Sequence, residues 1–220
     1  NGECRDMEMS QAARLRVEAL FGVAHVCTML GRIDEALEAI DQLVETAGHI
    51  GDATQLVRAA IMRGALIRTQ DPARAVEILE EALNECRKLR LSELECEALF
   101  ELAQAAAEAG DQRWGNRVAN QAVKTARRLG AASLVRRALV VEGTVTMMAG
   151  LHWRALYSLA EALDIARHAD DSEEAAKILH RLGFLHSELG AIDEAEKDLR
   201  AAKNICETTD NRPALAYTLH

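Results

Sequence analysis

Hydrophobic residues recur along the chain at helical spacing, in segments that alternate with short polar breaks. After Leu179, for example, Leu182, Gly183 and His186 follow at intervals that place them on one side of a helix. Breaks such as HIGDAT, KLRLSE, RLGAAS and HADDSE separate pairs of these segments, and a turn that usually contains Gly divides each pair. The pattern predicts an all-α chain of about ten helices, with the start of a further or capping helix at 210–220 as a partial eleventh.

The helical pattern repeats with a period close to 40 residues. One series of small residues is spaced by 39, 40, 40 and 40: Ala36, Ala75, Gly115, Ala155 and Ala195. A second series is spaced by 40, 39, 40 and 40: Ala24, Gly64, Ala103, Gly143 and Gly183. The series place the one-residue deletion differently, so it falls in RTQDPAR. We expect a single array over 1–220, with repeats at about 10–50, 51–90, 91–130, 131–170 and 171–209.

Two local signals support helix pairs. Asp71 followed by Pro72 is a strong helix start, because Asp caps the first turn and Pro suits the first helical position. Gly143 and Gly183 each cost about 1 kcal/mol of helix propensity relative to Ala, so we expect close helix packing to offset that cost.

The last repeat resembles the tetratricopeptide repeat, which combines a large apolar residue, a turn Gly and small residues in a fixed register. These residues are Leu179, Gly183, Gly190, Ala195 and Ala202, and the resemblance extends over about residues 10–208. The chain departs from the family in its longer period, its lack of a closing Pro and its few aromatic residues. The resemblance implies a right-handed superhelical solenoid of antiparallel helix pairs, of the long variant found in bacterial regulatory proteins.

In that family the first helix of each pair lines a concave groove. The resemblance then implies a partner-binding face that is apolar with basic edges, suited to an acidic or amphipathic peptide or protein. Its residues are Phe21, His25, Met29, Arg58, Ile61, Ala65, Arg68, Phe100, Gln104, Arg137, Val140, Thr144, Met147, Lys177, His180, Phe184 and Ser187. The alternative is that the three Phe residues pack within the array.

Charge and motifs narrow the function. The formal net charge of −9 disfavours nucleic-acid binding, which needs basic surfaces. No long uncharged apolar run is present, so we expect no membrane span and a cytoplasmic protein. No phosphate-binding, metalloprotease or hydrolase motif occurs, and His180 and His186 lie six residues apart, on different faces of a helix. We therefore expect no enzyme activity, no cofactor and no metal, and a buried, hydrogen-bonded His186.

Three functional hypotheses follow. The first is a non-catalytic protein-interaction or regulatory module that binds a peptide or partner domain in the groove. The second is a small-molecule-sensing regulatory domain of a larger bacterial signalling or transcription-regulator protein. The third is a self-association scaffold. The apolar segment ALAYTL near the C-terminus, where Leu219 continues the 40-residue series from Leu179, suggests further repeats, a following domain or a homo-oligomer contact through the C-terminal end.

Overall fold

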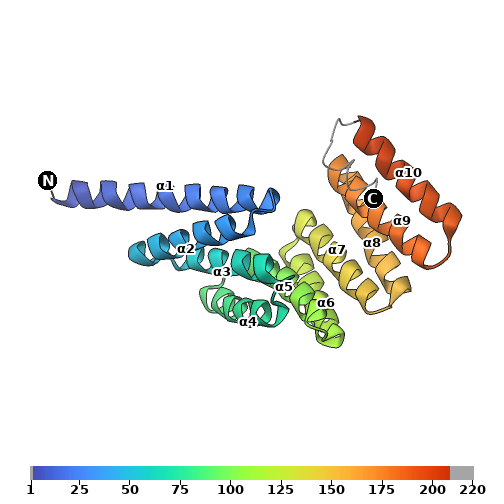
Figure 1. The fold of residues 1–220 in the computed structure, drawn as a ribbon, viewed down its shortest axis with the longest axis horizontal. Helices are drawn as coiled ribbons and strands as arrows, with labels where there is room; N and C mark the ends of the chain where they lie inside the picture. The colour runs from blue at the N-terminus through green and yellow to red at the C-terminus, as the bar shows by residue number, and fades with distance from the viewer. Residues whose placement is uncertain (1, 209–220) are drawn as a thin grey trace. The chain divides into compact units, whose positions relative to one another are not determined.

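The computed structural model describes residues 2–208, and the side chains of 11–208, as ten α-helices joined by short turns (Figure 1). The helices are α1 Gly2–Met29, α2 Ile33–Ile50, α3 Ala53–Ile67, α4 Pro72–Leu89, α5 Ser92–Glu108, α6 Gln112–Leu129, α7 Ala132–Met148, α8 His152–His168, α9 Ser172–Glu188 and α10 Ile192–Thr208. The odd-numbered helices are called first helices below, and the even-numbered ones second helices. The all-α prediction and the helix count over these residues are confirmed.

The chain forms two compact units, Asn1–Ala109 and Gly110–His220. In unit 1, α1 packs on α2, α2 on α3, α3 on α4 and α4 on α5. Unit 2 continues the same order, with α6 on α7, α7 on α8, α8 on α9 and α9 on α10. Because the chain divides into two units, one array with one groove over the whole chain stays a prediction.

The turns follow the backbone requirements that the sequence indicates. Gly31 and Gly150 end first helices at φ values of 70° and 72°, a left-handed conformation that Gly adopts without steric cost. The same conformation ends second helices between repeats, where Arg90 and Asp170 adopt it at 57° and 53°. Asp71 caps α4 as predicted, because its carboxylate accepts a hydrogen bond of 3.0 Å from the backbone N–H of Arg74, and Pro72 opens the helix.

The small residues of the second series allow close contact between paired helices. A Cβ added to Gly143 would lie 2.7 Å from Cγ of Leu159, and one added to Gly183 would lie 2.7 Å from Cγ of Leu199. At Gly64 the corresponding distance to Leu79 is 2.5 Å. All three are closer than carbon atoms pack, so the predicted reason for these helical glycines is confirmed.

The first helix begins at Gly2 rather than near residue 10, where the first repeat was expected to start. With 28 residues, α1 is the longest described helix. The predicted helix at 210–220 lies outside the described residues. Within the described part of the chain, none of the helices combines the length and the hydrophobicity that crossing a bilayer requires.

Candidate functional site: the first-helix faces

The predicted binding residues lie on five first helices at four repeat positions. Measured from the small residue of each first helix, these positions are −6, −3, +1 and +4, which form one face of a helix; Met29 alone lies at +5. Helices α1, α3 and α5 carry the set in unit 1, and α7 and α9 carry it in unit 2. The structure therefore presents two separate faces to assess.

In unit 1, a cation–π contact joins α1 to α3. The guanidinium carbon of Arg58 lies 4.3 Å from the centroid of the Phe21 ring, which is half-buried. His25 and Met29 continue the face of α1 toward its C-terminus and are both exposed. Phe21 thus has a partner within the unit, and of the predicted residues of α1 only His25 and Met29 remain open.

Arg68 joins α3 to α5 through two carboxylates that the sequence reasoning missed. Its guanidinium forms an ion pair with Glu108, and its Nε lies 3.8 Å from a carboxylate oxygen of Glu101. The expected basic edge is therefore neutralised here by acidic residues of the neighbouring first helix. Glu101 and Glu108 lie at positions −2 and +5, just beside the face, where the repeat pattern gave no reason to look.

Two predicted contact residues in unit 1 are buried. Phe100 is only 1% exposed and Ile61 is 6% exposed, so neither is open to a partner. Gln104, one turn beyond Phe100, is half-buried, and its amide donates a hydrogen bond of 3.4 Å to the carbonyl of Phe100. Phe100 and Ile61 therefore pack within the array rather than on an open surface. On the predicted face, unit 1 offers little exposed apolar surface outside α1.

In unit 2 the face of α7 and α9 is more open. Phe184 is 52% exposed, and Ser187 follows it on the exposed side of α9. Val140, Thr144 and Met147 of α7 are half-buried. Three Phe residues belong to the predicted face, and all three lie within the described residues. Phe184 is the one whose ring is mainly accessible.

A polar contact holds the two first helices of unit 2 together beside Phe184. Arg181, one turn before Phe184, donates a hydrogen bond of 3.0 Å from its guanidinium to Oγ1 of Thr144. His180 is half-buried, and its burial, together with the charge of Arg181, lowers the pKa of its imidazole below the ordinary 6.5. The ring is therefore neutral at neutral pH, which leaves Arg181 as the charge at this junction.

The N-terminal end of the same face is held by Arg136. Its guanidinium lies 2.5 Å from Asp171, the N-cap residue of α9, and 4.0 Å from Glu174. Burial alone would raise the pKa of Asp171, but the backbone N–H of Glu174 and the Arg136 guanidinium outweigh it and lower the pKa. The predicted face includes the neighbouring Arg137 but not Arg136.

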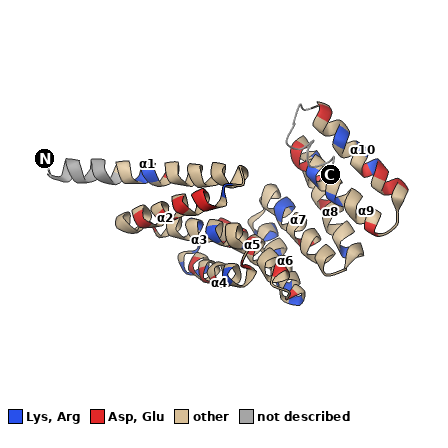
Figure 2. Cartoon of the chain, viewed as in Figure 1, with Lys and Arg blue, Asp and Glu red and all other residues tan. Residues whose placement is uncertain are grey.

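The predicted basic residues of this face also have local contacts. Lys177 forms ion pairs of 2.8 Å with Glu173 and 2.9 Å with Glu174 on its own helix. Burial would lower the pKa of Lys177, but these two hydrogen bonds raise it. Arg137 is exposed. The basic edge in unit 2 is present but largely balanced, as the mixed charges of the chain suggest (Figure 2).

Buried polar groups elsewhere stabilise helix pairs. The buried carboxylate of Glu142 accepts hydrogen bonds of 2.6 Å from Arg154 and 2.9 Å from Ser158, which fixes α7 to α8. His186 is half-buried and lies 2.9 Å from Asp198, so the predicted hydrogen bond is present although burial is partial. These groups have their partners within the helix pairs.

The cysteines whose side chains are described lie in the core. Cys27, Cys86, Cys96 and Cys206 are buried, as small hydrophobic residues commonly are. Burial, followed by the charge of Glu95, raises the pKa of Cys86 to about 11, so its reactive thiolate is scarce at neutral pH. Among the described residues no group of three or more His, Cys, Asp or Glu has the arrangement of a metal site.

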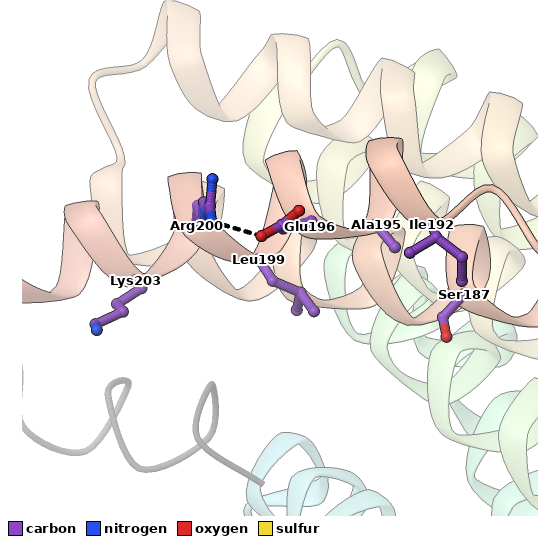
Figure 3. Close-up of a pocket in the computed structure, with 7 residues that line it drawn as sticks. All are labelled: Ser187, Ile192, Ala195, Glu196, Leu199, Arg200 and Lys203. Carbon is purple, nitrogen blue, oxygen red and sulfur yellow. Dashed lines mark ion pairs between the residues drawn. The ribbon is translucent and has the colours of Figure 1, made fainter.

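A shallow hollow lies at the end of unit 2, along α10 (Figure 3). It has a volume of about 420 Å³ and is lined by Ser187, Ile192, Ala195, Glu196, Leu199, Arg200 and Lys203. Glu196 and Arg200 form an ion pair of 2.5 Å across its wall (Figure 3). Of the predicted face, only Ser187 borders this hollow.

Comparisons with known proteins agree with the repeat and with the fold. Residues 176–209 match the family model described as Tetratricopeptide repeat. No curated protein matches the chain in sequence. The match covers α10 and most of α9, the helix pair in which the family's small and turn residues were identified.

Solved structures share the fold at low sequence identity. A Rap protein complexed with Competence and Sporulation Factor has a TM-score of 0.84 at 13% identity, over 93% of this chain and 57% of that one. BtubC (BKLC) from P. vanneervenii has a TM-score of 0.73 at 19% identity, over 96% and 88%. The Rap conjugation gene regulator of the plasmid pLS20, in complex with the Phr* peptide, has a TM-score of 0.78 at 13% identity, over 96% and 59%.

The chain thus spans little more than half the length of the Rap proteins, and at these identities the likeness concerns the fold alone. The repeat register, the paired helices and the family match agree on one architecture. Such repeats typically serve to bind proteins or peptides. Residues 176–209 therefore match a tetratricopeptide repeat, and the described chain has the paired-helix fold of such repeat proteins with a period of about 40 residues.

Proposed function

We propose that the chain is a non-catalytic module that binds a peptide or a partner's helix on the α7–α9 face of unit 2. The observation that carries the proposal is the exposed ring of Phe184 beside the Arg181–Thr144 hydrogen bond. A fixed aromatic ring loses little conformational entropy on binding, and aromatic residues dominate many interfaces. The contact between α7 and α9 holds this ring on a scaffold formed before the partner arrives.

The expected partner contributes an apolar side chain against Phe184 and acidic groups near Arg137 and Lys177. Because Lys177 already pairs with Glu173 and Glu174, an acidic partner residue would exchange one exposed ion pair for another, which is worth little. The apolar contact therefore supplies most of the affinity, and the charges favour one orientation of the peptide.

Unit 1 is the weaker candidate for the same role. Phe100 and Ile61 are buried, and Arg68 is paired with Glu101 and Glu108. A partner would have to break these contacts before it gained any of its own. The fold neighbours are consistent with a peptide ligand, since the pLS20 regulator was solved with the Phr* peptide, but that ligand belongs to that protein.

The small-molecule-sensing and C-terminal self-association hypotheses have less support in the structure. The hollow along α10 has a volume in the range of ligand sites, but exposed charged side chains form much of its wall, and they offer little to orient a small molecule. A role as one domain of a larger regulator and a cytoplasmic location remain compatible proposals. Self-association through the C-terminal end concerns residues that lie outside the described part of the chain.

A peptide-display selection tests the proposal. A library of random peptides is selected on the purified chain, and the enriched peptides are synthesised and titrated by fluorescence anisotropy against the wild type, Phe184→Ala and Tyr157→Ala. Tyr157 is a matched control because it is also an exposed aromatic of unit 2, 73% exposed, but lies on the second helix α8. We expect Phe184→Ala to weaken binding by roughly tenfold or more and Tyr157→Ala to leave it unchanged.

Two results would contradict the proposal. One is the recovery of no peptide that binds the wild type above background. The other is equal affinity of the enriched peptides for the wild type and Phe184→Ala, which would place binding on another surface. Circular dichroism of both variants shows whether each keeps its helical content.

A further inference from the structure

The first helix has a second apolar face that none of the helices described between residues 2 and 208 covers. One side of α1 packs into unit 1 through Val17, Ala24 and Cys27. On the other side Leu15, Val26 and Leu30 are 60%, 55% and 64% exposed. No Lys, Arg, Asp or Glu occurs from Ala19 to Leu30, and Figure 2 shows this part of α1 as uncharged. A helix that is apolar on two opposite sides normally has a neighbour on each.

The later repeats show what kind of neighbour this face receives. Every residue equivalent to Ala19 in the following first helices is buried, and so is every residue equivalent to Val26, whereas Ala19 and Val26 themselves are exposed. The equivalents of Ala19 are Ala59, Ala98, Ala138 and Ile178, and those of Val26 are Leu66, Ala105, Val145 and Leu185. In those repeats the preceding second helix packs on the first helix, as α2 does on α3 and α8 on α9. The uncovered face of α1 therefore has the chemistry of a helix–helix interface.

The arrangement of this face fits a second copy of itself. We propose that two chains associate through α1, with the two helices antiparallel about a two-fold axis that passes near Gly22 and Val23. This arrangement places Leu15 opposite Leu30 of the other copy. A two-fold interface requires a surface that is complementary to itself, and this pairing provides it.

The centre of the face can accommodate close contact. A Cβ added to Gly22 would meet no atom within 4 Å, so its backbone is open to an approaching helix. In the same pairing Ala19 lies opposite Val26 of the other copy, a small residue against a branched one. Glu18 comes near His25 of the other copy at the edge of the pairing.

Helix α10 of another copy does not suit the uncovered face. If α10 of one copy covered α1 of the next, chains would join end to end. However, Lys203 of α10 replaces Leu83, Val123 and Leu163, which are buried at the same position of earlier second helices. Lys203 is exposed, and burying it against an apolar helix would cost free energy. The two-fold pairing of α1 is therefore favoured over head-to-tail association.

One helix pair gives a modest interface, near the lower limit of about 1,200 Å² for stable complexes, so we expect a dissociation constant of roughly 10–100 μM. Sedimentation equilibrium of the full chain from about 5 to 500 μM covers that range. The wild type is expected to pass from monomer to dimer, and Val26→Glu to remain a monomer. Val44→Glu is the matched control, since Val44 is an exposed Val of α2 away from this face, and it should dimerise like the wild type.

A charge-pair experiment tests the antiparallel register. Ala19→Lys alone should also be a monomer, whereas an equimolar mixture of Ala19→Lys and Val26→Glu should form a heterodimer, because Lys at 19 then faces Glu at 26. Circular dichroism confirms that each variant is folded. A wild type that stays monomeric throughout the range overturns the proposal, as does a dimer that Val26→Glu leaves intact or a mixture that fails to associate.

Discussion

Phe100 in unit 1 and Phe184 in unit 2 both lie on first helices, yet one is 1% and the other 52% exposed. They occupy different repeat positions, −3 for Phe100 and +1 for Phe184. Across the five repeats the residues at −3 are buried or half-buried, whereas those at +1 are half-buried or exposed. The difference shows that the predicted face has an inner edge that belongs to the core and an outer edge that is available to a partner.

Replacing each Phe by Ala should show the largest difference in stability between the inner and the outer edge. We expect Phe100→Ala to lower the free energy of unfolding by about 3–5 kcal/mol, because it leaves a cavity in unit 1. Phe184→Ala should change it by less than about 1 kcal/mol, because the ring is mainly solvated. Urea unfolding followed by circular dichroism measures both. Equal losses would mean that the inner and outer edges are not distinct.

The glycines give a second comparison of inner and outer positions. Gly143→Ala places a Cβ 2.7 Å from Cγ of Leu159, and overpacking of about 1–3 kcal/mol should exceed the gain in helix propensity of about 1 kcal/mol. Gly48→Ala on α2 has nothing within 4 Å and should stabilise the chain by about 0.5–1 kcal/mol. Melting temperatures should therefore move in opposite directions, and a shared direction would argue against close packing at Gly143.

The smallest effect concerns the ion pair that fixes the outer face in unit 2. Asp171→Asn keeps a residue that can cap α9 but removes the charge that pairs with Arg136. Because the pKa of Asp171 is lowered in the folded chain, its charge stabilises the fold above the ordinary value of 3.8, and this contribution is lost as the pH falls through the lowered pKa.

We therefore expect Asp171→Asn to melt slightly below the wild type at pH 7, by less than about 1 kcal/mol in stability, and the gap to close in strong acid. Asp164→Asn, an exposed carboxylate of α8, is the control. A gap that stays constant from neutral to acidic pH would show that the lost charge is not its cause.

Much of the fold could be predicted from the sequence because its signals are local. The turn glycines, the Asp71–Pro72 helix start and the small residue at Gly143 each depend on a few neighbouring positions, and the structure confirms them. Because the sequence pattern repeats about every 40 residues, each local signal occurs several times along the chain.

The candidate site was less accessible to the same reasoning. Burial of Phe100 and the pairing of Arg68 with Glu101 and Glu108 depend on which helices lie alongside, and the spacing within one helix does not give that information. Likewise, periodicity predicted a helix in the first repeat, but not that α1 would carry a second apolar face that no described helix covers. The contacts in unit 1 and the open face of α1 both depend on the three-dimensional arrangement of neighbouring helices.

The left-handed residues between repeats have a consequence for how such a chain can change length. Gly51, Arg90, Gly130 and Asp170 end four second helices with one backbone conformation, although only two of them are glycine. The junction is therefore defined by its geometry more than by its residue, and any two junctions are interchangeable in form. Recombination between two of them would remove or duplicate a whole helix pair and keep the repeat in register, whereas loss of part of a repeat would shift every later helix out of register.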